Sequence, residues 1–300
     1  MLLVAATGAV AFSMGQGRQD RTPATVISGG DSVFHETMVD MNWQEVEKAA
    51  KDGAVVLMTT AVIEEHGPHM TCGTDAYLGY LLCKLTRREL ESRGVRTLVA
   101  PPFFWGINQT THVFPGTFTV SPETMKALLG DILSSLKSMG FTNIFNINAH
   151  MDSVHTRTVL AAIIDAQKNL GLNVRYVFAE EDARASGLTG EPPPFILLHK
   201  MPATSEKKTD VLDMHAGTFE TAMMAAYFPG QVNTALARTL QPTRVTAQQA
   251  REWVKDARKV TPLGYVGDPA SFNVAEARTF VERWCRSMAD AIQASVGRKQ

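Results

Sequence analysis

The feature that most constrains the fold is an apolar run, residues 54–63, with a cluster of acidic and imidazole side chains directly behind it. The run is β-branched and apolar without alternation, which is typical of a strand buried on both faces of a parallel sheet. The segment that follows, residues 64–75, reads Glu-Glu-His-Gly-Pro-His-Met-Thr-Cys-Gly-Thr-Asp. This polar segment therefore lies at the carboxyl end of a strand, where open α/β sheets bind ligands.

The chemical types of the side chains in residues 64–75 indicate a metal site. Carboxylate oxygens combined with imidazole nitrogens suit zinc, manganese or iron. Calcium and magnesium prefer shells made of oxygen alone. We therefore expect this loop to bind a divalent transition metal.

Strand patterns alternate with helical patterns along the rest of the chain. We expect strands over residues 95–100, 143–148 and 173–178, and helices over 76–93, 121–140, 153–170, 247–259 and 274–294. Strands that alternate with helices predict an α/β fold with a parallel sheet. Residues 149–153 follow the second of these strands, so their side chains are expected at the same sheet edge as residues 64–75.

The chain is expected to hold one domain behind an N-terminal leader, residues 1–33. An apolar stretch at residues 2–12 has the length of a signal-peptide h-region and is too short to span a bilayer, and a polar tether follows it. This pattern favours an exported, periplasmic protein. Because no basic residue precedes Arg18, a cytoplasmic protein with an ordinary N-terminus is the alternative. Residues 34–300 show no repeat and no linker and predict a single catalytic domain.

Composition excludes several classes of partner. A net charge of −1, from 29 basic and 30 acidic residues, provides no field that would hold a nucleic acid. No stretch is long and apolar enough to predict a membrane span. The three cysteines have no C-x-x-C spacing and cannot form a disulfide framework. The fold is therefore expected to be stabilised by its hydrophobic core.

Four stretches resemble the creatininase-like family of metal-dependent amidohydrolases. Residues 64–69 with Thr74 and Asp75 resemble that family's E-x-H-G-P-H…T-D signature, and residues 112–117 resemble an element that ends in F-P-G-T. His150 falls where the family has a histidine at a strand end, and residues 213–221 resemble its D-x-H-A-G-x-x-E-T segment. The resemblance covers roughly residues 40–230, with the motifs in the family's order.

The resemblance implies a three-layer α/β/α fold with a mostly parallel central sheet and the metal site at the carboxyl edge of the strands. It also implies two divalent metal ions, zinc (Zn) and/or manganese (Mn), with iron (Fe) as an alternative, together with a small-molecule substrate and a homo-oligomer. By this resemblance Glu64 and His150 bind one ion, His66 and Glu220 bind the other, and Asp75 bridges the two. Two cations about 4 Å apart share a water, and a bridging carboxylate relieves their repulsion.

Several roles stay open at this point. Asp152 stands two residues after His150 and either replaces Glu220 as a ligand or supports the ligands from outside. His215 and Asp213 are expected to form a proton-shuttling catalytic pair, since a neutral imidazole backed by a carboxylate can take and return a proton. The remaining candidates are substrate contacts: His112, for which simple loop packing is the alternative, and Trp105.

The expected reaction is hydrolysis of a C–N bond in a small cyclic or linear amide, through a water that bridges the metals. Hydrolytic ring opening of a cyclic polyol ketone or of a lactone is the second interpretation. A metal-dependent sugar isomerase and a non-catalytic metal-binding protein represent other classes. The sequence leaves the identity of the substrate open.

Overall fold

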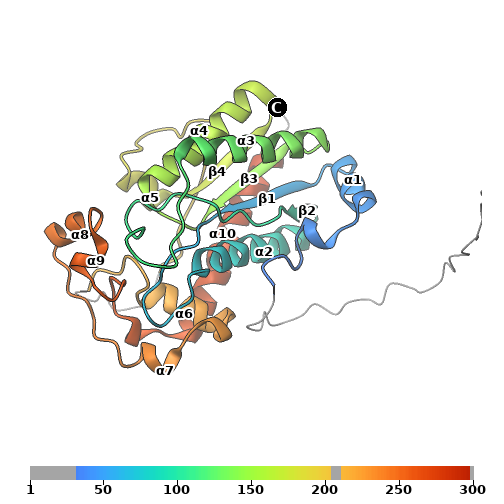
Figure 1. Ribbon diagram of the computed structural model, residues 1–300. Coiled ribbons are helices and arrows are strands. Elements are labelled where there is room, and N and C mark those ends of the chain that lie inside the picture. Colours follow the sequence, from blue (N-terminus) through green and yellow to red (C-terminus); the bar gives the residue numbers. More distant parts are fainter. Residues whose placement is uncertain (1–31, 204–210, 298–300) are drawn as a thin grey trace, which may run out of the picture.

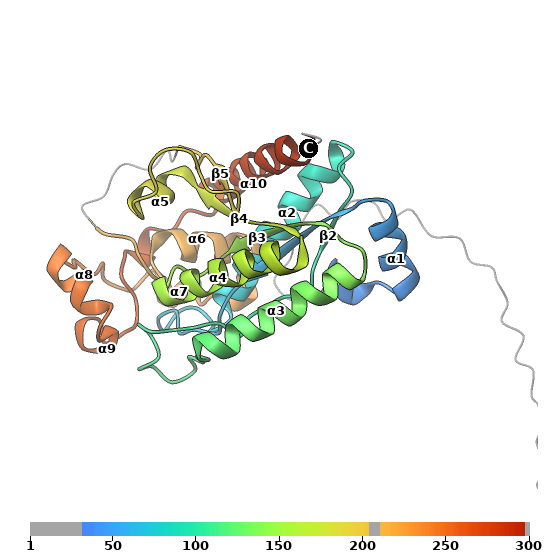
Figure 2. The same ribbon diagram turned by 90° about the horizontal axis from the view of Figure 1, so that it is seen from above.

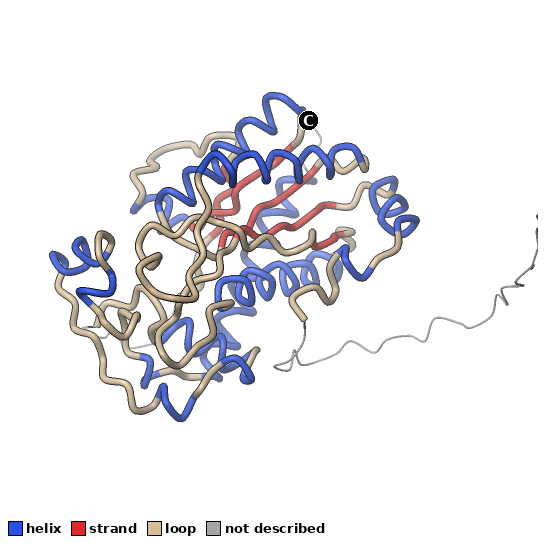
Figure 3. Tube along the Cα trace, in the orientation of Figure 1, coloured by secondary structure: helices blue, strands red, loops and turns tan. Residues whose placement is uncertain are grey.

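A single parallel sheet forms the centre of the molecule (Figures 1 and 3). The computed structural model describes residues 32–203 and 211–297. In this part of the chain the sheet has 5 strands in the order β2-β1-β3-β4-β5, every neighbouring pair parallel. Their bounds are Val55–Thr60 for β1, Thr97–Val99 for β2, Asn143–Asn148 for β3, Asn173–Ala179 for β4 and Ile196–His199 for β5.

Helices cover both faces of the sheet, so the fold is the three-layer α/β/α architecture that the resemblance implies (Figures 1 and 2). One face carries α2 (Thr74–Ser92), α6 (Thr218–Tyr227) and α10 (Val274–Gly297). The other carries α1 (Trp43–Lys51), α3 (Pro122–Ser138), α4 (Ser153–Leu170) and α5 (Glu180–Ala185). Shorter elements are α7 (Thr234–Ala237), α8 (Ala247–Trp253), α9 (Ala257–Val260), and the 3-10 turns η1 (Met38–Asp40), η2 (Pro229–Gln231) and η3 (Pro269–Ser271).

The apolar run at residues 54–63 forms the central strand, as its composition predicts. Every residue of β1 is buried. Val55 and Leu57 belong to the core under α2, α6 and α10, whereas Val56 and Met58 belong to the core on the opposite face. The strand is shorter than the run, because the pairing of β1 with β3 ends at Thr60.

The strand order places a crevice above the centre of the sheet. Strand β2 lies on one side of β1, whereas β3, β4 and β5 follow one another on the other side. The order in which strands are added therefore reverses between β1 and β3. At such a reversal the connections leave the two strands in opposite directions, and ligands bind outside their carboxyl ends. The two polar segments singled out in the sequence follow these two strands.

Other expected elements are confirmed, with two differences. The expected helix 247–259 is divided into α8 and α9, and the Asp256 side chain caps the second by accepting from the Lys259 N–H at 3.2 Å. Strand β5 is not among the expected strands; its four residues follow shortly after a run of prolines, which does not predict a strand. In the described part, no helix is long and apolar enough to cross a membrane.

Two expectations stay predictions. The expected leader, residues 1–33, lies outside the described residues except for its last two. The homo-oligomer implied by the resemblance is not tested by a single chain.

Gly79 marks the tightest contact between α2 and the sheet. A Cβ atom at this position would lie 2.1 Å from the Thr59 Oγ1 and 3.1 Å from the Ala149 Cβ. We expect Gly79→Ala to lower the free energy of unfolding by about 1–3 kcal/mol, because overpacking outweighs the better helix propensity of alanine. The matched control is Gly130→Ala in α3, where a Cβ meets nothing within 4 Å. Urea denaturation should show the control equal to or more stable than the parent.

Candidate metal centre

Acidic and imidazole side chains from both halves of the chain meet in the crevice. Glu64 and His66 lie in the loop after β1, and Asp75 lies in the first turn of α2. His150 follows β3, and Glu220 lies in the first turn of α6. Because β1 and β3 are neighbours in the sheet, their carboxyl ends bring segments that are far apart in sequence to one place.

The first group of ligand atoms comes from Glu64, Asp75 and His150. The His150 Nδ1 lies 3.1 Å from the Glu64 Oε2 and 3.1 Å from the Asp75 Oδ2. All three residues are buried. This geometry brings together the residues that the resemblance assigns to one metal.

The second group comes from His66, Asp75 and Glu220. The His66 Nε2 lies 3.2 Å from the Asp75 Oδ1 and 3.8 Å from the Glu220 Oε2. The two oxygens of Asp75 therefore face different groups, Oδ1 toward His66 and Oδ2 toward His150. Asp75 therefore lies between the two groups and belongs to both.

The spacing of these atoms fits metal coordination. Atoms that share one tetrahedral ion at about 2.1 Å lie roughly 3.4 Å from one another. The observed distances of 3.1, 3.1, 3.2 and 3.8 Å bracket this value. The His66 Nε2 and the Asp75 Oδ2 are buried and have no hydrogen-bond partner among the described residues. A divalent transition ion would satisfy both atoms, and the mixed oxygen and nitrogen set suits zinc or manganese.

In each imidazole of the two groups, the outer nitrogen, which is the ring nitrogen that is not among the ligand atoms, forms a hydrogen bond that fixes the ring. The His66 Nδ1 lies 3.1 Å from the Glu64 carbonyl oxygen, and the His150 Nε2 lies 3.1 Å from the Ile107 carbonyl oxygen. A carbonyl oxygen only accepts, so these outer nitrogens carry the hydrogen and the inner nitrogens are left to bind a cation. The Thr111 hydroxyl similarly donates to the Glu64 Oε1.

His155 supports His150 from behind and is a residue that the sequence analysis missed. Its Nδ1 accepts the Ile107 N–H at 3.2 Å, and its Nε2 lies 3.0 Å from the Asn148 Oδ1. The ring packs edge-on against His150 with centroids 5.1 Å apart. Burial, together with the charge of His150, lowers the pKa of His155 to about 3, so this imidazole is neutral. Its position in the first turn of α4 carries no local sequence signal.

Opposite charges compensate one another in this buried cluster. Burial opposes charge on His66, but the carboxylates of Asp75 and Glu220 raise the pKa of His66 to about 10. Burial likewise opposes charge on Asp75, and the imidazoles of His66 and His150 hold the pKa of that carboxyl well below its usual range. A cation that binds here replaces these imidazole protons, so metal binding is coupled to proton release.

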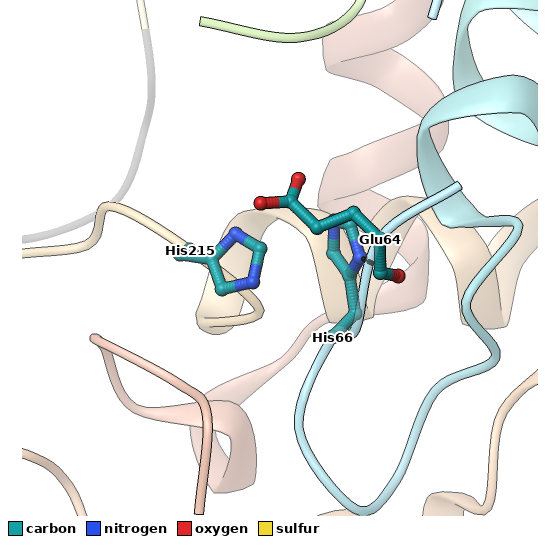
Figure 4. A group of neighbouring side chains, drawn as sticks. All are labelled: Glu64, His66 and His215. Carbon is teal, nitrogen blue, oxygen red and sulfur yellow. Dashed lines mark hydrogen bonds between the residues drawn. The ribbon is translucent and has the colours of Figure 1, made fainter. Parts of the chain in front are cut away.

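His215 forms a third group with Glu64 and His66 (Figure 4). The His215 Nε2 lies 2.8 Å from the Glu65 carbonyl oxygen and 3.3 Å from the Glu65 Oε1. The ring lies between His66, with centroids 4.4 Å apart, and Trp253, with centroids 5.5 Å apart. Glu65, which the sequence analysis did not single out, is therefore the carboxylate at the His215 imidazole.

Asp213 closes the turn into α6, which differs from its expected pairing with His215. Its carboxylate accepts the Thr218 N–H at 3.1 Å and the Phe219 N–H at 2.9 Å. A Cβ on Gly217 would lie 1.6 Å from the Asp213 Oδ1, and one on Gly267 would lie 2.3 Å from it. The carboxylate occupies a space that two glycines leave open, and it caps the helix that carries Glu220.

Asp152 and Glu220 are placed differently. The Asp152 Oδ1 accepts the N–H groups of Val154 and His155 at 2.8 and 3.1 Å, and its Oδ2 accepts the Gln109 N–H at 2.9 Å. Asp152 is thus the N-cap of α4 and stands in none of the groups found among the described residues. Of the two alternatives left open by the sequence, the structure brings Glu220 to the centre.

The two predicted substrate contacts lie outside the ligand groups. His112 is exposed, and its Nδ1 lies 2.7 Å from the Gln109 carbonyl oxygen. Trp105 is 45% exposed and packs against Phe104 and Phe118, with ring centroids 5.3 and 6.1 Å away. Their contact with substrate stays a prediction.

Comparisons with known proteins identify the family of the chain. The family model described as "Creatininase: Creatinine amidohydrolase" matches residues 39–292. A mycofactocin precursor peptide peptidase of Mycolicibacterium smegmatis is 24% identical over 243 residues, which cover 80% of this chain and 84% of that protein. A creatinine amidohydrolase of Pseudomonas putida is 27% identical over 120 residues, 38% of this chain and 44% of that protein.

Solved creatininases share the fold. A crystal structure of creatinine amidohydrolase superposes with a TM-score of 0.62 and 20% identity, covering 91% of this chain and 98% of that one. A manganese form gives 0.61 and 19% identity over 87% and 98% of the two chains. A variant of the Zn-Zn type gives 0.60 and 20% identity over 88% and 98%. At this identity the likeness shows the fold.

Asp75→Asn should reduce the content of bound metal more than any other single ligand change, because both groups share this carboxylate. We expect less than half of the parent's metal after reconstitution with zinc or manganese, measured by inductively coupled plasma mass spectrometry. Asp152→Asn is the matched control, since asparagine also caps helices well and the residue lies outside the groups. Equal metal content in the two variants would contradict the bridging position of Asp75.

Proposed function

The chain belongs to the creatininase family of hydrolases, and from that premise we propose that it cleaves the C–N bond of an amide with the help of two divalent cations. The observation that carries the proposal is the shared Asp75, whose two oxygens face two separate groups of ligand atoms. A carboxylate in this position supports two cations at once. A single structural ion would need only one of the groups.

The ligand groups define which residues would hold the cations. Glu64, Asp75 and His150 would hold one, and His66, Asp75 and Glu220 would hold the other. When bound, such cations polarise a carbonyl oxygen and lower the pKa of water toward neutrality. Solved creatininases described as manganese and Zn-Zn forms support zinc or manganese as the ions.

His215 supplies the proton transfer in this proposal. Its Nε2–H donates to the Glu65 carbonyl oxygen, which fixes the tautomer and leaves Nδ1 to accept a proton and to return it to a leaving nitrogen. The buried Glu65 carboxylate, 3.3 Å from the Nε2, stabilises the imidazolium that forms. Burial opposes that charge, but Glu64 and Glu65 raise the pKa of His215 above its usual range.

Amide hydrolysis is favoured over the other interpretations by the relatives. The relatives from Mycolicibacterium smegmatis and Pseudomonas putida are by name a peptidase and an amidohydrolase, and both names denote cleavage of C–N bonds. Ring opening of a cyclic ketone or a lactone uses the same ligand set, so the substrate panel must include these compounds.

The test of the proposed function is turnover in oxygen-18 water. The zinc- or manganese-loaded protein is offered a panel of cyclic amides, linear amides and dipeptides, with a lactone and a cyclic diketone beside them. We expect an amide to be cleaved with one oxygen-18 atom in the new carboxylate, detected by mass spectrometry. Turnover of only the lactone or the ketone, or a product without the label, would overturn the proposal.

His215→Ala separates proton transfer from metal binding. We expect both cations to stay bound and turnover to fall by about 10² to 10⁴-fold, the range for loss of a general acid–base group. Added imidazole should restore part of the turnover, which a purely structural role would not allow. His35→Ala is the control, because the His35 side chain is half-exposed, pairs with Asp40 and belongs to none of the ligand groups found among the described residues. Loss of a metal ion in His215→Ala would instead make this residue a ligand.

A further inference from the structure

The metal centre is closed on most sides and opens beside Glu220. The side chains of His66, Asp75 and Glu64 are 0, 3 and 4% exposed, whereas that of Glu220 is 23% exposed. A substrate therefore reaches the cations from the side of α6.

A cavity of about 240 Å³ lies on that side. Glu220 is part of its wall, and so are Ala149 and Met151, the two neighbours of His150. The rest of the wall comes from α2, α5, α6, α10, the end of β3 and the carboxyl-terminal parts of β4 and β5. Through Glu220 the cavity therefore borders the second ligand group. Its volume is below the roughly 300 Å³ at which drug-sized pockets begin, so it suits a group of the size of one amino-acid side chain.

The wall of this cavity is apolar and deformable. It is lined by Met151, Met201, Met223 and Met288 together with Phe219 and Trp284. Methionine side chains adapt to differently shaped apolar groups and contact aromatic rings favourably. Phe219 and Trp284 also pack against each other, with centroids 6.2 Å apart, and form an aromatic surface.

The charges of the described lining residues disfavour anionic groups in the cavity away from the ligand groups. Its acidic residues are Glu220 and Asp182, and the lining that the structure describes contains no lysine or arginine. His199 also lines the cavity, but burial lowers its pKa, so this imidazole adds no positive charge at neutral pH. Away from the ligand groups, a carboxylate in the cavity would find no lysine or arginine among the described lining residues and would lie near the acidic side chain of Asp182.

We propose that the substrate is a peptide-type amide with an uncharged aromatic or long aliphatic side chain next to the scissile bond, and that this side chain fills the cavity beside Glu220. The inference rests on the proposed amide hydrolysis and names its substrate class. A small polar ring alone would leave the methionine and aromatic wall without a partner.

Binding of hydroxamates tests the cavity without turnover. Hydroxamates chelate divalent cations, so acetohydroxamate and phenylacetohydroxamate differ here only in the group offered to the wall. We expect the phenyl compound to bind the zinc-loaded protein about 10 to 100-fold more tightly, as burial of one aromatic group implies. Isothermal titration calorimetry measures both affinities. Equal affinities, or no binding of either compound, would overturn the proposal.

Two substitutions that add a negative charge test whether the phenyl group binds in this cavity. Met151→Glu and Met201→Glu each add a carboxylate to the wall at a position that is not fully buried, and should remove most of the phenyl preference. Met139→Glu, at an exposed site outside this cavity, is the matched control and should keep the preference. A preference that survives both wall substitutions would place the phenyl group elsewhere and contradict the proposal.

Dipeptides connect the cavity to catalysis. Xaa-Gly and Gly-Xaa series with glycine, alanine, leucine, phenylalanine and aspartate should show kcat/KM rising from glycine to phenylalanine in one series, with aspartate lowest. A flat series with turnover would contradict the substrate class while leaving amide hydrolysis intact. A phenyl preference in hydroxamate binding without hydrolysis of any amide would contradict the proposed function while leaving the cavity assignment intact.

Discussion

The structure depends on the neutralisation of several carboxylates that lie close together in its interior. Glu64, Asp75 and Glu220 place carboxylates in the same crevice, and their repulsion is offset by the imidazoles of His66 and His150. Burying charges without partners costs far more than a small domain's stability, so each carboxylate requires a partner within a few ångströms. That requirement links β1, β3, α2 and α6 into one unit. Asp75 also lies in the first turn of α2, where the helix N-terminus stabilises negative charge.

Much of this arrangement is predictable from the sequence, because it depends on residue patterns within single strands and helices. The β-branched run at residues 54–63 fixes a buried strand, and alternating helical patterns fix a parallel sheet. In a parallel sheet the polar residues that follow each strand lie at the same edge. The proximity of Asp75 and His150 therefore follows from the topology. The motif resemblance adds Glu220, which no periodicity indicates.

The parts that the sequence did not reveal depend on contacts between distant segments. Glu65 and Asp213 are both acidic residues near His215, and only the folded turn decides that Glu65 contacts the imidazole while Asp213 caps α6. Asp152 has a carboxylate that could bind a metal, but its oxygens accept hydrogen bonds from three backbone N–H groups. The supporting role of His155 likewise requires the loop that carries Ile107 to lie against α4.

The cavity and the ligand groups share Glu220 but otherwise use different residues, and this division determines which parts of the wall can change independently of the ligands. The cations would be held by residues of the first 150 positions plus Glu220, whereas α10 and the ends of β4 and β5 contribute wall residues and no ligand. Substitutions on α10, such as at Trp284 or Met288, can therefore reshape the wall while the charge balance of the centre stays unchanged. Under the proposed function, such substitutions would change which amides fit the cavity while the residues that would hold the cations stay in place.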